Sequence, residues 1–369
     1  MKPRPLHITL AQHNVSRARH VTDEIRFKLT TQKAEILLLQ EPYAINNKPQ
    51  TLGSQVKILT SKKKDEYPWA AIAVTNPTIT VTNLKHHGNC NTVVAEIIKE
   101  QYKLYAISGY LSPHQDVTFT LNHLGGILHT LRGSNIILGI DSNAHSTSWG
   151  SATTDAAGEA IEMFIAQHDL TIINEPSNIT IFCSNWGSSN IDLTLARGSI
   201  KRRISDWRVE DNWTTSDHRE LSLNITTTRV SPLLQTQVQA RYKTKLRSYI
   251  SFNVKLKHNL NDIEAVELNA RNIDNYTVLL ENCFIKTAET TLKKPNNRRT
   301  TVPWWTASLT KLRKETHTDR KLFQNARNEH REQKRLKYIA TKKRYVLALR
   351  RAKRDSWRSY VAKESQRNP

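Results

Sequence analysis

The sequence has few cysteines and no long hydrophobic run, and these absences exclude several classes of protein. The three cysteines, Cys90, Cys183 and Cys283, are far apart and form no Cys-x-x-Cys pair, which excludes a zinc ribbon or a zinc knuckle. Their wide spacing fits reduced thiols in an intracellular protein. Because no apolar run approaches the ~20 residues that span a bilayer, a membrane is not an expected partner. The strand-like segment 6–10 also begins too early to leave room for the apolar core of a signal peptide.

Glycine is absent from the second part of the chain, since all eleven glycines lie between Gly53 and Gly198. Turn-rich architecture is therefore expected in the first part alone, where two sequence patterns alternate. Short apolar or alternating runs predict strands over residues 34–39, 104–107, 135–140, 179–182 and 220–225. Apolar residues at helical spacing predict helices over residues 21–29, 121–131 and 161–168. Strands that alternate with helices indicate a layered α/β domain, predicted for residues 1–228.

Positive charge is concentrated near the end of the chain. The net charge is +22, and residues 291–369 alone contain 24 Lys and Arg but only 6 Asp and Glu. A polyanion is the natural partner of such a segment, and nucleic acid is favoured over a membrane surface. Residues 304–368 contain neither Gly nor Pro and are rich in helix-forming residues, so a basic helical segment is predicted over residues 301–369. A polar, partly helical connector is predicted before it, over residues 229–300.

Eight polar residues stand at or near the ends of apolar runs, where buried strands normally lead into turns of Gly, Pro and Ser. They are Asn14, Glu41, Tyr110, Asp141, Asn143, Asp192, Asp217 and His218. Strands deliver such residues to the edge of a sheet, where loops build sites. Carboxylates, amides, a phenol and an imidazole together can hold a hard divalent cation and cut a phosphodiester bond. Taken singly, most of these residues are more often structural residues in a turn.

Three of the candidates have predicted roles in metal binding and in attack. Glu41 follows the most apolar run of the chain, and a hard cation such as Mg²⁺ takes one or two carboxylates, so Glu41 is a candidate metal ligand. Asp141 and Asn143 lie two residues apart on an extended segment, where side chains point to the same side. Asp141 is therefore expected to accept a proton from an attacking water or to orient it. Asn143 is expected to donate a hydrogen bond to a phosphate oxygen.

The remaining candidates are donors and the residues that hold them. Asp217 is expected to fix the tautomer and orientation of an imidazole, and His218 to stabilise negative charge on the phosphate. Asp192 lies within an apolar segment, where an unpaired carboxylate is costly, so its expected partner is either His218 or the metal shell. The phenol of Tyr110 and the amide of Asn14 are expected to donate to phosphate oxygens.

In their order along the chain, the eight residues resemble the pattern of the endonuclease/exonuclease/phosphatase superfamily. That pattern consists of an Asn after the first strand, a Glu after a later strand, a Tyr, an Asp-x-Asn, a late Asp and a terminal Ser-Asp-His. Single matches are weak, but the ordered set is specific and covers roughly residues 5–227. The resemblance implies a four-layered α/β sandwich of two mixed sheets flanked by helices, here followed by a basic α-helical extension. It also implies a catalytic role for all eight residues, Glu41, Asp192 and Asp217 as metal ligands, and Mg²⁺ as the cofactor, with Mn²⁺ as an alternative ion.

Finer features lie in short segments of the same region, at residues 141–145, 149–151, 158–159, 174–176 and 188–194. These segments resemble the apurinic-type endonuclease of non-LTR retrotransposons, near the Jockey group and the insect elements that insert into ribosomal DNA. Trp304 and Trp305 before a basic helix resemble the connector that precedes the reverse transcriptase in those polyproteins. The chain has no aromatic-x-Asp-Asp motif, so it is not expected to polymerise DNA and is expected to be a truncated or fragmentary copy.

The resemblance implies a Mg²⁺-dependent endonuclease that nicks double-stranded DNA in the nucleus. The nick would carry a 3′-hydroxyl, the primer for target-primed reverse transcription, and element RNA is a second candidate partner through the basic tail. One alternative keeps the fold and changes the substrate, as in an abasic-site repair endonuclease or a related phosphodiesterase or phosphatase. Another is a catalytically dead remnant that only binds nucleic acid. If the tail binds nucleic acid, removal of residues 291–369 should weaken binding and flatten its salt dependence, and cleavage of a short duplex should survive.

Overall fold

The computed structural model of the protein describes residues 6–31, 34–177, 179–184, 187–210, 214–227, 246–264, 273–292, 302–326 and 330–367. The chain divides into two compact units, one formed by residues 1–236 with 300–369 and one by residues 237–299. The second unit contains the helices α4 (Leu246–Glu264) and α5 (Ile273–Thr291), joined by a hydrogen bond of 2.9 Å from Asn259 Nδ2 to Thr287 Oγ1. The described part of the predicted polar connector is therefore largely helical.

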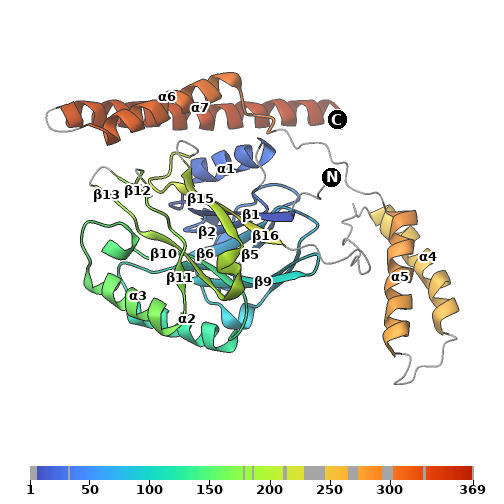
Figure 1. The fold of residues 1–369 in the computed structure, drawn as a ribbon. Helices are drawn as coiled ribbons and strands as arrows, with labels where there is room; N and C mark the ends of the chain where they lie inside the picture. Colours follow the sequence, from blue (N-terminus) through green and yellow to red (C-terminus); the bar gives the residue numbers. More distant parts are fainter. Residues whose placement is uncertain are drawn as a thin grey trace, which may run out of the picture. The chain divides into compact units, whose positions relative to one another are not determined.

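Two six-stranded sheets form the centre of the first unit (Figure 1). The first sheet has the order β15 (Ile204–Glu210), β16 (Glu220–Thr227), β1 (Leu6–Asn14), β2 (Ile36–Gln40), β6 (Ala70–Val74) and β5 (Lys57–Leu59). The second has the order β11 (Thr171–Ile172), β14 (Asp192–Arg197), β10 (Ile136–Asp141), β9 (Tyr102–Tyr110), β8 (Thr92–Lys99) and β7 (Thr80–Asn83). Two short ribbons accompany them, β3 (Ala44–Ile45) with β4 (Lys48–Pro49) and β12 (Phe182–Cys183) with β13 (Ser188–Ser189).

Helices cover the outer face of each sheet (Figure 1). The helix α1 (Arg19–Thr31) packs on the first sheet, while α2 (Val117–Thr130) and α3 (Ala156–Gln167) pack on the second. Alternate residues of β2 face opposite ways, since Ile36 and Leu38 join the core between the sheets and the intervening leucines join the core under α1. A strand covered on both faces has a continuous apolar sequence. The predicted four-layered α/β sandwich is confirmed.

The pairing of the strands brings the polar strand ends together at one edge. The strands β1 and β2 are parallel and end side by side, with Asn14 paired to Gln40. The strands β9 and β10 are also parallel, and Tyr110 pairs with Asp141 at their ends. The antiparallel β14 begins opposite that point, with Asp192 paired to Asp141. Three of the predicted site residues therefore meet through the register of the second sheet alone.

Most of the predicted elements are confirmed, with shifts of a few residues at their ends. The strand predicted over residues 179–182 is wrong, because only the pair Phe182–Cys183 forms a short strand. The backbone of this segment is instead satisfied by loop partners: the Ile181 N–H donates to Asn190 Oδ1, and the Arg219 N–H donates to the Ile181 carbonyl. The helix α3 begins before the predicted start because Asp155 caps it, accepting from the Gly158 N–H at 2.7 Å.

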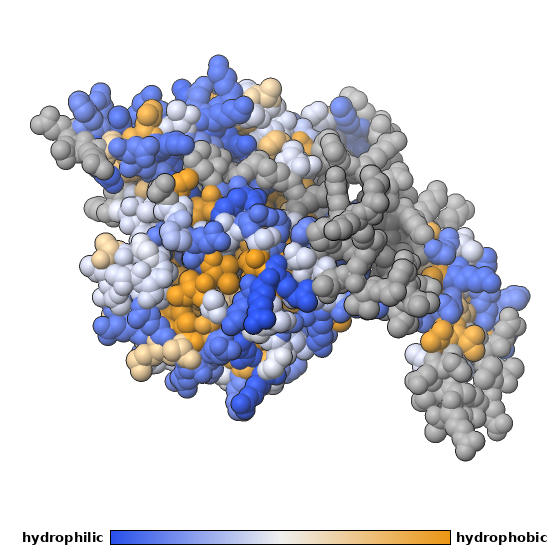
Figure 2. All heavy atoms as spheres, in the orientation of Figure 1, coloured by the Kyte–Doolittle hydropathy of each residue, from blue (hydrophilic) through white to orange (hydrophobic). Residues whose placement is uncertain are grey.

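The basic segment forms two helices, α6 (Ala307–Gln324) and α7 (His330–Arg367), as predicted. They pack on one another around the buried Leu309, Tyr345 and Leu349 and belong to the same compact unit as the two sheets. Figure 1 shows this helical pair running past α1 on the outer side of the first sheet. The face visible in Figure 2 is mostly hydrophilic over α6 and α7. No helix in the described part of the chain is long and apolar enough to cross a membrane.

Candidate active site

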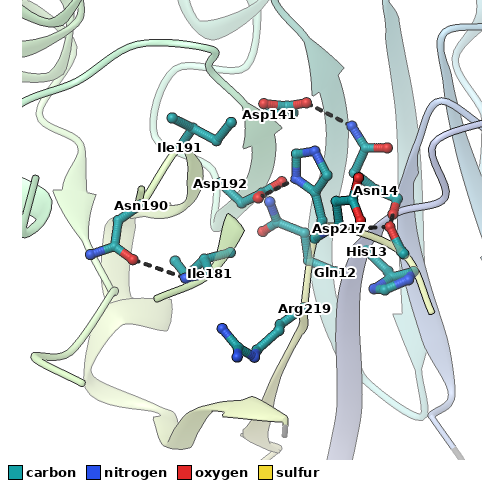
Figure 3. Close-up of polar contacts among 12 residues, drawn as sticks. Gln12, His13, Asn14, Asp141, Ile181, Asn190, Ile191, Asp192, Asp217 and Arg219 are labelled. Carbon is teal, nitrogen blue, oxygen red and sulfur yellow. Dashed lines mark hydrogen bonds and ion pairs between the residues drawn. The ribbon is translucent and has the colours of Figure 1, made fainter. Parts of the chain in front are cut away.

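Two aspartates and a histidine form a buried cluster at the shared edge of the sheets. One ligand atom from each of Asp141, Asp192 and His218 lies within 4.8 Å of the other two, and all three side chains are buried. The imidazole is held by Asp192, whose Oδ2 lies 2.7 Å from His218 Nδ1 (Figure 3). The sequence left Asp192 with two candidate partners, and the structure places it against the histidine.

Asn14 joins this cluster to Glu41. The Asn14 Nδ2 donates to Asp141 Oδ2 at 2.7 Å (Figure 3), and it also donates to Glu41 Oε1 at 3.1 Å. Its Oδ1 accepts from the Ser16 N–H at 2.7 Å. Because both amide hydrogens are used on carboxylates, Asn14 holds the two acids in place and does not have the free donor that was predicted for a phosphate.

Glu41 lies on the rim of the cluster in a strained backbone conformation. Its φ of 45° is in the left-handed region, as is the φ of 47° of Asn143, and such conformations concentrate at functional sites. Arg17 Nε lies 3.0 Å from Glu41 Oε2, and the side chain of the glutamate is 15% exposed. The carboxylate is therefore held by a cation and an amide while part of it faces solvent.

Tyr110 lines the same edge and stacks on an aromatic residue that the sequence analysis missed. The rings of Tyr110 and Trp69 are 5.2 Å apart and nearly parallel, and Arg17 lies 5.3 Å from the Trp69 ring. Burial raises the pKa of Tyr110, and the charges of Glu41 and Asp141 raise it further. The phenol therefore stays protonated at neutral pH. The signal for Trp69 was its place directly before the apolar strand 70–74, but an aromatic residue there is common.

The side chains of Asn143 and Asp217 contact residues outside the cluster of Asp141, Asp192 and His218. The Asn143 Nδ2 donates to the Leu111 carbonyl at 2.8 Å, which leaves one amide hydrogen for a ligand. The Asp217 carboxylate was predicted to hold the imidazole of His218. In the structure, Asp192 holds it instead. Asp217 instead pairs with Lys342 of α7, at 3.3 Å from Oδ1 to Nζ. Its side chain is 42% exposed, so it lies at the surface beside the cluster.

The charges of the cluster shift the pKa values of its members. Burial raises the pKa of Asp141 to about 7, and the charge of Asp192 contributes to this rise. Burial alone would lower the pKa of His218, but the carboxylates of Asp192, Asp141 and Glu41 together raise it to about 9. The imidazole is therefore a cation at neutral pH, in a cluster with Asp141, whose pKa lies close to neutral pH.

Two buried glutamines beneath the site tie the sheets to one another. Gln12 Nε2 donates to the Ile140 carbonyl at 3.2 Å, and Gln40 Nε2 donates to the Gly139 carbonyl at 3.1 Å. Thr194 Oγ1 donates to Gln12 Oε1 at 2.9 Å. The sequence analysis did not select these glutamines, although each directly precedes or lies near a selected residue. These hydrogen bonds cross from one sheet to the other, so they fix the distance between the strand ends, although Gln40 Oε1 has no partner among the described residues.

Gly139→Ala is expected to lower the free energy of unfolding of the two-sheet unit by about 1–3 kcal/mol, as overpacking does. A Cβ at this position would lie 2.7 Å from Gln12 Oε1 and 2.8 Å from Leu38 Cδ1. Urea unfolding followed by tryptophan fluorescence measures the change. Gly126→Ala in α2 is the matched control, because its new Cβ would have nothing within 4 Å. Equal stability of the two variants would contradict the close packing of Gly139.

The donor set fits a divalent cation of the hard class. Asp192 Oδ1 is buried without a hydrogen-bond partner among the described residues, and an unsatisfied carboxylate oxygen in a buried site is unusual. Asp141 and Glu41 present further oxygens, joined through the shared amide of Asn14. Carboxylate oxygens are the ligands that Mg²⁺ prefers. Glu41 and Asp192 from the predicted metal set lie in this arrangement, whereas Asp217 lies with Lys342.

Comparison with known proteins identifies similar sequences in retrotransposons. Residues 104–222 match a family model described as endonuclease-reverse transcriptase. The chain is 25% identical over 335 residues to the Pol polyprotein from the type-1 retrotransposable element R1 of Bradysia coprophila, covering 86% of this chain and 33% of that protein. It is 23% identical over 343 residues to a putative 115 kDa protein in the element R1DM of Drosophila melanogaster, covering 84% and 31%. The chain thus spans about a third of the length of these relatives.

Solved structures share the fold of the two-sheet part. The endonuclease domain of TRAS1, a telomere-specific non-LTR retrotransposon, superposes with a TM-score of 0.54 at 26% identity, covering 60% of this chain and 99% of that one. The AP endonuclease LMAP from Leishmania major gives a TM-score of 0.50 at 11% identity, which shows a likeness of fold alone. The predicted resemblance to the endonuclease/exonuclease/phosphatase superfamily, and to the endonucleases of non-LTR retrotransposons within it, is confirmed.

Proposed function

From this likeness and the geometry of the site, we propose that the protein is a Mg²⁺-dependent DNA endonuclease of a non-LTR retrotransposon. It nicks one strand of target DNA in the nucleus and leaves a 3′-hydroxyl for target-primed reverse transcription, and Mn²⁺ is an alternative ion. The observation that carries the proposal is the cluster of Asp141, Asp192 and His218, linked to Glu41 through the amide of Asn14. These five residues come from five separate parts of the chain and meet at one edge.

Asp141 is the group that accepts the proton of the attacking water. A general base works best when its pKa lies near the working pH, and burial raises the pKa of Asp141 to about 7. The amide of Asn14 fixes one of its oxygens at 2.7 Å, so the position of the carboxylate is set before substrate binds. Water activation by this residue therefore needs little rearrangement.

His218, Tyr110 and Asn143 are the donors to the phosphate as negative charge develops on it. Since Asp192 occupies His218 Nδ1, the other ring nitrogen, Nε2, is the one that donates, and it carries a hydrogen because the imidazole is protonated. Tyr110 donates through its protonated phenol. Preorganised donors of this kind stabilise charge that develops in the transition state.

The proposed metal would be held by Glu41 with Asp192, and whether Asp217 also contributes stays a prediction. When bound, Mg²⁺ supplies charge neutralisation at the scissile phosphate and at the leaving oxygen. Arg17, beside Glu41 and 58% exposed, is placed to contact the backbone of the DNA substrate next to the site. An arginine at this position adds salt-dependent affinity without sequence preference.

Cleavage of intact and abasic duplexes of one sequence tests the proposed function. We expect the full chain to nick intact supercoiled DNA with Mg²⁺ and to stop when EDTA is added. A strong preference for the abasic duplex would instead support a repair endonuclease of the same fold. Binding of either duplex without cleavage would indicate a catalytically dead remnant and would contradict the proposal.

The nicking rate is expected to follow a bell-shaped pH profile. It should rise as pH passes about 7, because only ionised Asp141 accepts a proton and its pKa is about 7. It should fall as pH passes about 9, because His218 Nε2 donates only while the imidazole is protonated and its pKa is about 9. The measurement is kcat/KM against pH at constant ionic strength. A rate that keeps rising beyond the pKa of His218 would argue against this role of the histidine.

Single-stranded nucleic acid, such as element RNA, is the proposed partner of the helical pair. A groove of about 890 Å³ lies between the start of α6 and the later part of α7. It is lined by the aromatic residues Trp304 and Tyr360 and by the cations Arg344, Arg351 and Lys363. Single strands bind where bases stack on aromatic rings and phosphates meet cations, and Tyr360 is 55% exposed.

Tyr360→Ala is expected to weaken binding of a single-stranded RNA oligonucleotide by about tenfold, the loss of one stacked base. Fluorescence anisotropy at several salt concentrations measures the dissociation constant. Tyr249→Ala is the matched control, since Tyr249 is a similarly exposed tyrosine (53%) on α4, which does not line the groove. Equal affinity of the two variants would show that the groove does not hold the RNA.

A further inference from the structure

The loop before β16 carries the Ser-Asp-His motif and is held from two sides. On the inner side, Ser216 Oγ donates to the Asn14 carbonyl at 2.8 Å, which ties the loop to the end of β1. On the outer side, Arg320 of α6 donates to the Thr214 carbonyl at 3.3 Å and to the Asp217 carbonyl at 3.1 Å. Lys342 of α7 contacts the Asp217 carboxylate at 3.3 Å.

A buried glutamate on α1 extends this contact between the loop and the helical pair. Glu24 Oε2 accepts from the Thr215 N–H at 2.8 Å and from Thr215 Oγ1 at 3.1 Å. Tyr345 of α7 is fully buried against it, and burial together with the charge of Glu24 raises the pKa of this tyrosine. The residue that precedes Ser216 is therefore fixed by a side chain that is itself enclosed by α7.

The helical pair is anchored on α1 by contacts that do not involve the loop. Lys353 Nζ lies 2.7 Å from both carboxylate oxygens of Asp23, and the ring of Trp305 stacks on Phe27 at 3.9 Å. These anchors are separate from the contacts of Arg320 with the loop. Loss of the loop contacts should therefore leave the helices docked, which allows the two effects to be measured apart.

We propose that Arg320 and Lys342 are positioning residues that hold the Thr214–His218 loop, so that the C-terminal helical pair sets the rate of cleavage as well as binding nucleic acid. This inference rests on the proposed endonuclease function. Arg320 is 5% exposed and donates to the carbonyls of Thr214 and Asp217, which lie on either side of Ser216. These contacts hold the backbone that leads into His218. A displacement of about 1 Å in a reacting group can cost about a hundredfold in rate. The contacts of Arg320 and Lys342 with this loop, here called the clamp, should therefore affect kcat.

The proposal changes the effect on cleavage that is expected when the basic segment is removed. A segment that served only in binding would leave cleavage of a short duplex intact when removed. The contacts with Thr214, Thr215 and Asp217 imply instead that cleavage of a short duplex depends on the helical pair.

Two variants of the full chain test the clamp, Arg320→Gln and Lys342→Met. We expect Arg320→Gln to lower kcat for duplex nicking by about tenfold or more and to change KM by less than twofold, because the loop is displaced while the DNA surface is kept. Lys342→Met should lower kcat by a smaller factor, since the lysine is partly exposed. Arg320→Lys should restore part of the loss through its remaining charge and donors. Thermal unfolding of each variant reports whether the helices remain docked.

Each variant has a matched control on the same helical pair. Lys337→Met removes a lysine of α7 that pairs with Asp319 at 3.0 Å, an ion pair that involves no residue of the loop. Arg335→Gln removes an arginine that pairs with Glu332 at 2.7 Å. Both controls should keep the wild-type kcat. A variant that raises KM at constant kcat, or a kcat equal to that of the controls, would overturn the clamp.

The outcomes separate this inference from the proposed function. If the wild-type chain nicks DNA and Arg320→Gln does so at the same kcat, only the clamp is wrong. If the wild-type chain does not nick DNA under any metal condition, the proposed function itself is wrong. Should Arg320→Gln fail to fold, substitution of the partly exposed Lys342 still decides the question, through the kcat of Lys342→Met against that of Lys337→Met.

Discussion

Asp141→Asn is expected to reduce the nicking rate by about a thousandfold, within the range for loss of a general base. The amide keeps the shape of the side chain but cannot accept the proton of the attacking water. The new side-chain amide would also lie against the amide of Asn14, whose Nδ2 donates to Asp141 Oδ2 at 2.7 Å in the wild-type protein. The rate of conversion of supercoiled to nicked plasmid measures the loss, and binding of the duplex should change little.

Asp116→Asn is the matched control for this substitution. Asp116 caps the start of α2 by accepting from the Thr118 N–H at 2.9 Å, and this hydrogen bond involves no residue of the site. Asn is as good a cap as Asp, so neither stability nor nicking should change. If Asp141→Asn nicks DNA at the rate of Asp116→Asn, Asp141 is not the base.

Asp192→Asn is expected to lower kcat by about a thousandfold or more, the scale seen when the acid that orients a catalytic histidine is lost. The carboxylate lies 2.7 Å from His218 Nδ1 and raises the pKa of the imidazole. Without it, the histidine loses its proton at lower pH and no longer donates from Nε2 at neutral pH. The alkaline limb of the pH profile should therefore move from about 9 toward lower pH. A thousandfold loss without this movement would point to a role in metal binding alone.

A second Asp–His pair in the chain provides the control for Asp192→Asn. Asp155 Oδ2 lies 3.0 Å from His145 Nδ1, but both side chains are more than 40% exposed. Asp155→Asn keeps the cap of α3 and should leave the pH profile unchanged. Both pairs contain the same Asp–His contact. A difference between the two variants therefore shows the effect of burial on the pair at the site.

The arrangement of the site was largely predictable, since most of its residues lie at strand ends. Tyr110, Asp141 and Asp192 are neighbours through the register of adjacent strands, and any sandwich that pairs these strands brings them together. The position of a polar residue at the end of an apolar run is a local pattern, whereas the order of the strands in each sheet is not. The absence of Gly and Pro and the richness in helix-forming residues predicted a helical segment at residues 301–369, but not its division into two helices.

The partners of individual side chains were not predictable in the same way. Asp217 follows Ser216 and precedes His218, but a side chain next to another in sequence points elsewhere when the loop turns. The imidazole therefore pairs with Asp192, which reaches it from the other sheet. The contact of Asp217 with Lys342 joins residues 125 positions apart, and no spacing in the sequence indicates it.

The packing of α6 and α7 on α1 and on the Thr214–His218 loop was not predictable, for a related reason. The basic composition of the helical pair suggested a segment that faces solvent and nucleic acid, and its few apolar residues gave an irregular stripe. Several of its contacts with the rest of the unit are polar, as in Arg320 with the Thr214 carbonyl and Lys353 with Asp23. Polar contacts of this kind carry no periodic signal, although they fix an interface once the fold has formed.

One assay addresses the central claim that these scattered side chains form a single metal-dependent cutting site. Supercoiled plasmid is incubated with the full chain in Mg²⁺, in EDTA, and in EDTA followed by excess Mg²⁺, and the nicked product is then offered to a DNA polymerase. The account predicts nicking only when Mg²⁺ is available, with ends that the polymerase extends without prior phosphatase treatment. Nicking that persists in EDTA, or ends that cannot be extended until a phosphate is removed, would contradict it.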